Sequence, residues 1–332
     1  MWLLIREGSA ARNLQALLPL LAEYGPSRIA FCTDDREPEH IADDGHINSM
    51  VRDAVAFGIP PEDALTAATL SPSLWHGLAH LGAVAPGYHA DLLVLPDLER
   101  FVPETVLKRG SPAAEIPEAE VPDWVRHTVR IGAFGPEMFR IPWAGGDARV
   151  IGIVPGQILT DSLVDAPAHR AGEALPDPER DLAKIAVVER HLGTGRVGLG
   201  FVRGFGLRRG ALASSVAHDA HNVVVVGMND ASMAAAVRRL ANRGGGIVVV
   251  DGAEVLAELP LPVAGLLSDA PLADVLEASH AVIAAARELG CELEAPFQHL
   301  AFLALSVIPS LKLTDRGLVD VDRFELVPLE AE

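Results

Sequence analysis

Residues 28–36 of the chain read RIAFCTDDR, an apolar run that ends in two adjacent carboxylates. The run Arg28–Cys32 predicts a short buried strand, because a Gly-Pro pair just before it breaks the preceding helix. Upstream, Trp2–Ile5 predicts another strand, and Ala10–Leu21 predicts a helix with its leucines on one face. Two consecutive strand–helix units indicate a parallel sheet, so the predicted fold class is α/β.

Asp34 and Asp35 directly follow the second predicted strand. The C-terminal ends of parallel strands are where β/α barrels place catalytic groups. One carboxylate there can bind a divalent metal and take a proton from its bound water, while its neighbour hydrogen-bonds a ring nitrogen of a substrate. Both residues are therefore candidate catalytic groups. The alternative is structural, with one aspartate capping a helix beside a solvated neighbour.

The next part of the chain predicts helices and then short strands. Ile47–Phe57 and Pro61–Leu70 have helical spacing. Gly82–Gly87 and Ala90–Leu95 follow a strand-and-turn pattern, which indicates a β-rich segment. Residues 111–122 are rich in Pro, Ala and Glu, and we predict a domain boundary there.

Beyond residue 122 the pattern indicates a second α/β or α+β domain, in which strands and helices are mixed. The predicted strands are Ala183–Val188, Ala211–Val216, Val223–Val226 and Ile247–Val250, and the predicted helices are Asp230–Arg243 and Ala273–Leu289.

The composition is that of a globular protein: 49% of the 332 residues are hydrophobic and 22% are charged. The formal net charge of −18 repels phosphate backbones and anionic lipids, so we expect neither nucleic acid nor a membrane as a partner. No apolar run approaches the ~20 residues that span a bilayer. Cys32 and Cys291 form no Cys-x-x-Cys motif, and the first residues do not resemble a secretion signal. We therefore expect a cytoplasmic protein.

Other polar residues lie near the two predicted strand ends. Glu7 and Ser9 follow the first strand, where either faces a substrate or Ser9 caps the next helix. His46 lies eleven residues after Asp35, in the loop and helix that follow the second strand. It is a candidate substrate contact, with helix capping or loop ordering as the alternative.

The segment SSVAHDAHN, residues 214–222, interrupts two apolar strands with polar groups. His218 and Asp219 are candidates for a hydrogen-bonded pair that contacts a substrate from a lid. A polar turn with internal hydrogen bonds explains the same residues equally well.

Two further patterns carry little weight. His76 and His80 are four residues apart on a predicted helix, but no glutamate lies between them to act as the base of an HExxH site. Gly193–Gly198 fits the GxGxxG pattern, but no helix pattern follows it, which favours a tight turn over a dinucleotide site.

Longer stretches resemble adenine deaminases of the amidohydrolase superfamily. MWLLIREGSAARNLQALLPLL, RIAFCTDDR and DDGHINSMVRDAVAFGI are similar to the last two β/α units of their barrel, and TAATLSPSLWHGLAHLGAVAPGYHADLLVL is similar to the exit into a small β-sandwich. Residues 185–227 and 311–324 resemble their C-terminal domain. The resemblance implies that residues 1–80 are the C-terminal remnant of a metal-dependent (β/α)8 amidohydrolase barrel. Residues 81–115 then form a β-sandwich segment, and residues 123–330 form an α+β C-terminal domain.

The resemblance also implies a reaction, the hydrolytic deamination of adenine to hypoxanthine and ammonia in purine salvage, at a manganese, iron or zinc centre. Asp34 matches the family's metal ligand on the last barrel strand. It is expected to hold metal and deprotonate water while Asp35 hydrogen-bonds a purine nitrogen, although the reverse assignment stays open. Arg36 is expected to orient either carboxylate. Low-ranked substrate contacts are Asp35, Arg36, His46, Glu7, His218 and Asp219.

The family also implies a His-x-His pair, another carboxylate and two single histidines on earlier barrel strands. This sequence contains no His-x-His. We therefore expect the chain to be inactive without a missing N-terminal half, encoded upstream or carried by a separate chain, and we expect association, including homo-oligomers, to cover the open barrel edge. The alternatives are a non-catalytic truncated homologue that acts as a ligand-binding or subunit-interaction module, and an enzyme of the same class that acts on another cyclic amidine or amide.

Overall fold

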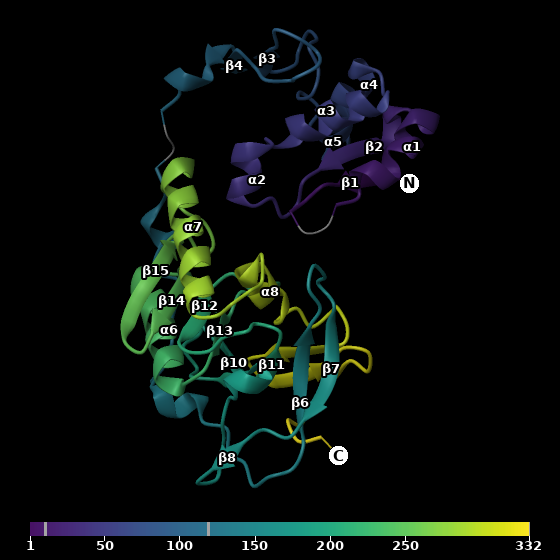
Figure 1. Ribbon diagram of the computed structural model, residues 1–332. Coiled ribbons are helices and arrows are strands. Elements are labelled where there is room, and N and C mark those ends of the chain that lie inside the picture. Colours follow the sequence, from purple (N-terminus) through teal and green to yellow (C-terminus); the bar gives the residue numbers. More distant parts are fainter. Residues whose placement is uncertain (10–11, 118–119, 332) are drawn as a thin grey trace. The chain divides into compact units, whose positions relative to one another are not determined.

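The computed structural model describes residues 1–9, 12–117 and 120–331 (Figure 1). The contacts within the chain divide it into two compact units, Met1–Glu120 and Val121–Glu332.

The first unit is built on two parallel strands, β1 (Leu3–Arg6) and β2 (Ile29–Cys32), with Arg6 paired with Cys32. Helix α1 (Leu14–Tyr24) and the 3-10 turn η1 (Pro26–Arg28) connect them. Because both strands run in the same direction, their C-terminal ends meet at one edge, where Asp34 and Asp35 follow β2.

Four helices follow β2, and two of them, α3 (Ile47–Phe57) and α4 (Pro61–Ala68), contribute to the core of this unit. The other two are α2 (Pro38–Asp43) and α5 (Leu70–Trp75). Apolar side chains from both strands and from α1, α3 and α4 form one buried cluster. Its members include Ile5, Leu14, Leu18, Leu21, Ile29, Phe31, Met50, Ala54 and Ala64. The leucines of α1 recur at helical spacing, as the sequence predicts.

A small antiparallel sheet follows, in the order β3 (Leu92–Val94), β4 (Thr105–Lys108) and β5 (Ser111–Pro112), and the 3-10 turn η2 (Ala113–Glu115) ends it. Of the two predicted strand-and-turn segments, only the second contains a strand. Gly82–Gly87 forms bends and turns instead, since its glycines at 82 and 87 take left-handed backbone angles.

Two helix predictions in this unit are also corrected. Helix α1 begins at Leu14 and not at residue 10; residues 10 and 11 lie outside the described part of the chain. Helix α5 ends at Trp75, before His76 and His80, because a turn with a left-handed Gly77 follows. The two histidines therefore do not share a helix face.

The second unit is built on an eight-stranded sheet in the order β15-β14-β12-β13-β10-β11-β6-β7. Neighbouring strands pair antiparallel except β11 and β6, which are parallel. The strands are β6 (Ala148–Ile153), β7 (Thr160–Asp165), β10 (Leu182–Val188), β11 (Val197–Arg203), β12 (Ala211–Ser214), β13 (Val223–Gly227), β14 (Gly246–Asp251) and β15 (Glu254–Pro260).

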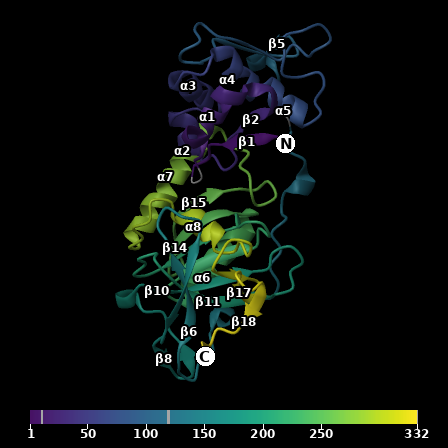
Figure 2. The ribbon, with the colours of Figure 1, turned by 90° about the vertical axis from the view of Figure 1, so that its right-hand side faces the viewer.

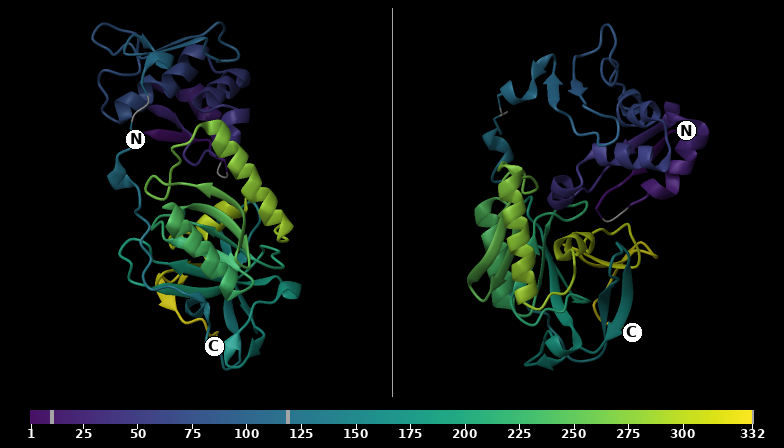
Figure 3. Two further views of the ribbon diagram at one scale, coloured as in Figure 1. Left: turned by 90° about the vertical axis from the view of Figure 1, so that its left-hand side faces the viewer. Right: turned by 45° about the horizontal axis from the view of Figure 1, so that its top comes forward.

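Helices cover both faces of this sheet (Figures 2 and 3). On β10, Ile185 and Val187 belong to the buried cluster that includes side chains of α7 (Leu272–Glu288) and α8 (Pro296–Phe302), while Ala186 and Val188 belong to the cluster that includes side chains of α6 (Asp230–Arg243). All seven residues of β10 are buried, as expected of a strand covered on both sides.

Smaller elements complete the second unit. They are the three-stranded sheet β16 (Leu311–Thr314), β17 (Gly317–Asp320) and β18 (Glu325–Val327), the pair β8 (His169–Arg170) and β9 (Glu173–Ala174), and the 3-10 turns η3 (Asp123–Val125), η4 (Pro136–Phe139) and η5 (Pro178–Arg180). The two units together confirm the predicted α/β class at the level of a mixed α/β protein. Among the described residues, no helix is long and apolar enough to cross a membrane.

In the glycine-rich segment, residues 193–196 form a loop and residues 197–198 begin β11, so a strand follows and not a helix. The Glu189 carboxylate accepts hydrogen bonds from the backbone N–H groups of His191, Leu192 and Thr194, which fixes the loop and holds the pKa of Glu189 near 2 despite the opposing effect of burial. The segment therefore lacks the helix that a dinucleotide site requires after its glycines.

Candidate active site

The two aspartates lie where β2 turns away from the sheet. Asp34 has a left-handed backbone, with φ of 58°, and the Arg36 N–H donates to the Asp34 carbonyl at 3.0 Å. The Asp34 side chain is 58% exposed and that of Asp35 is 19% exposed. The first carboxylate therefore opens to solvent, while the second is largely enclosed.

Arg6, the last residue of β1, holds both carboxylates. Its Nη1 lies 2.8 Å from Asp34 Oδ2, and its Nη2 lies 2.5 Å from Asp35 Oδ1. The parallel register explains the contact, because Arg6 pairs with Cys32 and so lies beside the start of the turn. Sequence reasoning missed this role of Arg6; the signal was a lone cation at the end of the neighbouring strand.

The residues after β1 enclose Asp35 further. The Ser9 N–H donates to the Asp35 carbonyl at 2.8 Å. A Cβ on Gly8 would lie 2.1 Å from Asp35 Oδ1, well inside van der Waals contact, so only glycine fits against this carboxylate in its observed position.

Arg36 does not take the expected place beside Asp34 and Asp35. Its side chain is 5% exposed, and its guanidinium donates to the Gly45 carbonyl at 3.2 Å and pairs with Asp44 at 3.4 Å. The turn after β2 directs Arg36 into the loop before α3, where it orders backbone. The cation paired with both carboxylates is Arg6.

Glu7 and Ser9 both bind residues at the start of helices, and the helix that Ser9 contacts is not the predicted one. Glu7 Oε2 accepts from the N–H of Leu14, the first residue of α1, at 2.9 Å. Ser9 Oγ accepts from the Glu37 N–H at 2.8 Å and lies 2.8 Å from His40 Nδ1. Ser9 therefore does not cap α1, because the helix begins five residues after it, and Glu7 binds that end.

His46 lies at the start of α3, close to the same strand end. Its Nε2 is 3.2 Å from the hydroxyl of Thr33, the buried residue that precedes Asp34. Its carbonyl accepts from Ser49 Oγ at 2.7 Å, and its side chain makes no capping bond. The structure thus brings His46 into contact with Thr33, the residue directly before Asp34.

Glu37 adds a titratable group that the sequence did not reveal. Burial, together with the like charges of Glu39 and Asp35, raises the pKa of the Glu37 carboxyl to about 7. Glu37 is therefore partly protonated near neutral pH, and it lies close enough to Asp35 for the two charges to interact.

The donor chemistry of this site fits one position of a divalent metal centre. Asp34 offers a carboxylate oxygen, Oδ1, that makes no hydrogen bond or ion pair within the described part of the chain. Hard oxygen donors suit manganese, and zinc and iron also accept them. No group of three or more His, Cys, Asp or Glu side chains that could hold a metal occurs among the described residues. A complete centre needs further ligands.

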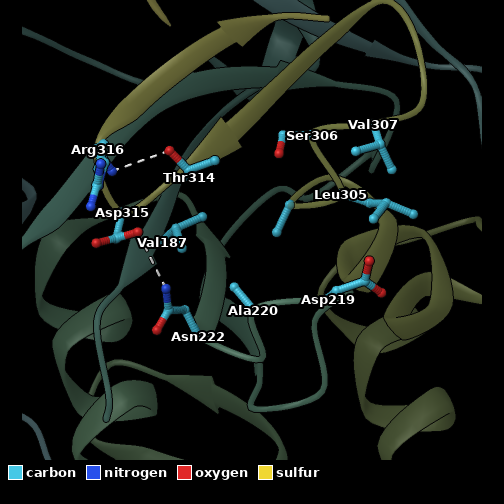
Figure 4. Close-up of a pocket in the computed structure, with 11 residues that line it drawn as sticks. Val187, Asp219, Ala220, Asn222, Leu305, Ser306, Val307, Thr314, Asp315 and Arg316 are labelled. Atoms are coloured by element: carbon cyan, nitrogen blue, oxygen red, sulfur yellow. Dashed lines mark hydrogen bonds between the residues drawn. The ribbon is translucent and has the colours of Figure 1, made fainter. Parts of the chain in front are cut away.

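A separate pocket lies within the second unit, with a volume of about 270 Å³ (Figure 4). Its walls come from the loop after β12, the loop after α8 and the β16–β17 turn. Asp219 and Asn222 line it, and Asn222 Nδ2 donates to Asp315 Oδ1 at 3.4 Å. Polar side chains and an apolar floor thus meet at the end of β10.

His218 and Asp219 differ in their surroundings. The His218 ring stacks on Phe302, with centroids 4.7 Å apart and planes inclined by 5°, and its Nδ1 is buried without a hydrogen-bond partner among the described residues. Asp219 is exposed at the pocket. The turn also contains internal bonds, such as the His221 N–H to the Ala217 carbonyl at 2.6 Å. The proposed substrate contact of His218 and Asp219 stays a prediction.

Comparison with known proteins places this chain in a family. The family model described as "Adenine deaminase C-terminal domain" matches residues 157–325, about half of the chain. The chain belongs to the adenine deaminase family. The model described as "Amidohydrolase family" matches residues 4–132, which include Arg6, Asp34 and Asp35.

Adenine deaminases from distant organisms align with almost the entire chain. The protein of that name from Methylobacterium sp. (strain 4-46) is 48% identical over 331 residues, which cover 99% of this chain and 58% of the relative. Those from Desulfatibacillum aliphaticivorans and Methanothrix thermoacetophila are 45% and 48% identical over 335 residues, again 99% of this chain and 59% of each relative. The chain thus spans slightly under three fifths of the length of these relatives.

Proposed function

We propose that this chain takes part in the metal-dependent hydrolysis of adenine to hypoxanthine and ammonia. The observation that carries the proposal is the pair Asp34 and Asp35 at the C-terminal end of β2, held by Arg6, in a chain of the adenine deaminase family. Adenine is the proposed small-molecule partner, since the relatives are named for it.

The fold supports a division of the chain into three structural segments. We assign residues 1–80 to the end of a (β/α)8 barrel, with β1 and β2 as its last two strands, 81–115 to a β-sandwich segment and 123–330 to the C-terminal domain. The parallel pairing of β1 and β2 and the amidohydrolase match over residues 4–132 support the first assignment. The ends of barrel strands carry the chemistry in this architecture.

Exposure separates the roles of the two carboxylates. Asp34 is the more open and would hold the metal through Oδ1, and Asp35, enclosed by Gly8 and Ser9, would fix a nitrogen of the purine ring by a hydrogen bond. A bound manganese, iron or zinc ion supplies a water of lowered pKa at neutral pH. In the hydrolysis, a water oxygen would replace the amino nitrogen on the ring carbon. One proton of that water would pass through the Asp34 carboxylate to the amino group, which leaves as ammonia, and the other would end on the ring nitrogen.

Further ligands and contacts come from outside this pair. The described residues hold no complete metal centre, so the remaining ligands are supplied by another segment, by a separate chain or by a second copy of this one. His46 is the nearest candidate for a substrate contact, with Glu7, Arg36, His218 and Asp219 ranked below it. The reaction belongs to purine salvage in the cytoplasm, a location supported by two unpaired cysteines.

The test combines this chain with the part of a relative that it does not match. In the combined protein, this chain replaces the matching 331 residues of the Methylobacterium adenine deaminase. We expect it to convert adenine to hypoxanthine, followed by ultraviolet absorbance. Removal of metal with a chelator should abolish turnover, and manganese should restore it.

The unmodified relative and this chain alone are the controls. A folded combined protein that leaves adenine unchanged, while the relative is active, contradicts the proposed function and favours a binding or subunit-interaction role. Turnover by this chain alone contradicts the need for ligands from elsewhere.

A further inference from the structure

We propose that Arg6 is the positioning residue of the site, which fixes the spacing and orientation of Asp34 and Asp35 relative to each other. This inference rests on the proposed function for its catalytic consequence. The placement of the two carboxylates by Arg6 can be tested without it.

The backbone brings three charged side chains to one point. Successive side chains of an extended strand point to opposite faces, so two adjacent aspartates would ordinarily diverge. The left-handed backbone at Asp34, with φ of 58°, breaks this alternation. Both carboxylates then reach the same guanidinium, at 2.8 and 2.5 Å.

The geometry of arginine suits this task. A guanidinium is planar and presents its donors in a rigid fork, whereas a lysine ammonium is a point charge on a flexible stem. Nη1 and Nη2 of Arg6 each take one carboxylate, and Nε is buried without a hydrogen-bond partner among the described residues. The two terminal nitrogens of Arg6 therefore bridge the two aspartates, and do not bind one carboxylate together.

The contact also divides the oxygens of each carboxylate. Arg6 pairs with Oδ2 of Asp34, and Oδ1 makes no hydrogen bond or ion pair within the described part of the chain. On the other carboxylate it occupies Oδ1, the atom that also lies against Gly8. Arg6 thus presents Asp34 to the open side of the site and holds Asp35 against the β1 loop.

The first test is a double-mutant cycle on the thermal unfolding of this chain. We combine Arg6→Gln with Asp34→Asn and, separately, with Asp35→Asn. We expect each double variant to lose less Tm than the sum of its single variants, by about 2–4 °C. Arg6→Gln combined with Asp97→Asn is the matched control, because Asp97 pairs with Arg100 and not with Arg6, and its effects should add.

The second test uses turnover in the combined protein. Arg6→Ala should lower kcat by about 10- to 100-fold, since small displacements of catalytic groups have effects of this size. Millimolar guanidinium chloride should restore part of the loss, whereas sodium chloride at the same ionic strength should not. Arg6→Lys should recover less than guanidinium does, because an ammonium cannot bridge both carboxylates in plane.

The outcomes separate this inference from the proposed function. Additive Tm losses in both cycles overturn the role of Arg6, whatever the activity. Coupled losses without guanidinium rescue in an active protein overturn positioning as well, and leave only a structural ion pair. If the wild-type combined protein is inactive, the proposed function fails, and the cycles alone decide whether Arg6 holds the two aspartates.

Discussion

Gly8 shows how strictly a single residue constrains the site. It follows β1, and a Cβ at this position would lie 2.1 Å from Asp35 Oδ1 and 3.0 Å from the Thr33 carbonyl. An alanine there must displace the Asp35 carboxylate from Arg6. Carboxylate placement therefore depends on a residue that carries no functional group.

We predict that Gly8→Ala lowers adenine turnover of the combined protein by about 10- to 100-fold, because the acid group moves away from its productive position. The same variant should lower the Tm of the chain. Steady-state kinetics and thermal unfolding measure the two effects. In an Asp35→Ala background the contact with Oδ1 disappears and only the 3.0 Å approach to the Thr33 carbonyl remains, so Gly8→Ala should then cost less stability. An equal loss in both backgrounds would contradict this explanation.

At the scale of single residues, the sequence indicates which carboxylates are candidate site residues, but it does not indicate which side chains they contact. Asp34 and Asp35 stand out because they follow an apolar strand. Arg6 does not, because its pairing depends on the register of β1 against β2 and on the left-handed turn at Asp34. Arg36 is the nearer cation in sequence, yet the same turn carries it into another loop. The pKa of Glu37 depends on burial by distant residues, which no local pattern reveals.

Strand β16 carries an unusual buried charge at the scale of one element. Lys312 is fully buried, and its Nζ donates to the Ile158 carbonyl at 3.0 Å. Burial lowers the pKa of Lys312 from its ordinary 10.5 to about 8. The lysine lies near His299 of α8, whose pKa is lowered by burial and by the Lys312 charge. A buried ammonium of this kind destabilises the fold.

The pH dependence follows from the direction of that shift. Below pH 8 the lysine is protonated in both states, and the folded state carries the full cost of burying the charge. Between pH 8 and 10.5 the unfolded chain binds a proton that the folded chain lacks, so this contribution to stability improves as pH rises.

We therefore predict that Lys312→Met raises the free energy of unfolding at pH 7 by about 1–3 kcal/mol, after allowance for the carbonyl left without its donor. The advantage should shrink toward pH 10. Denaturant unfolding at both pH values measures it. Lys108→Met, which removes an exposed lysine, is the control and should show no such trend. A gain that is independent of pH would contradict charge burial as the cause.

At the scale of single elements, a helix can be predicted where the capping residues and the spacing of its apolar residues indicate the same bounds. Helix α6 runs over Asp230–Arg243 as predicted, with Asn229 capping its start and Gly244 ending it in a left-handed conformation. Strand β11 was not predicted, because Gly198 and Gly200 interrupt its apolar pattern. Gly198 lies against the Thr314 carbonyl of β16, a long-range contact that only the folded structure explains.

At the scale of the whole molecule, the sequence indicates a parallel β/α part followed by a mixed α/β or α+β domain. It does not indicate the order of the strands in the sheets. The order β15-β14-β12-β13-β10-β11-β6-β7 places strands that are distant in sequence side by side. Sequence patterns identify individual strands, but their pairing depends on long-range packing. Alternate residues of β10, for example, belong to two different buried clusters, one on each face of the sheet. The proposed metal site also belongs to this scale, because no group of three or more His, Cys, Asp or Glu side chains that could hold a metal occurs among the described residues.

The central claim is that Asp34 of this chain acts in adenine deamination, and the most direct test is the initial rate of hypoxanthine formation by the combined protein carrying Asp34→Asn. We predict a loss of at least about 100-fold relative to wild type, because the amide neither takes the proton nor offers an anionic ligand oxygen. Asp97→Asn should keep the wild-type rate. A folded Asp34→Asn protein that retains the wild-type rate would contradict the claim.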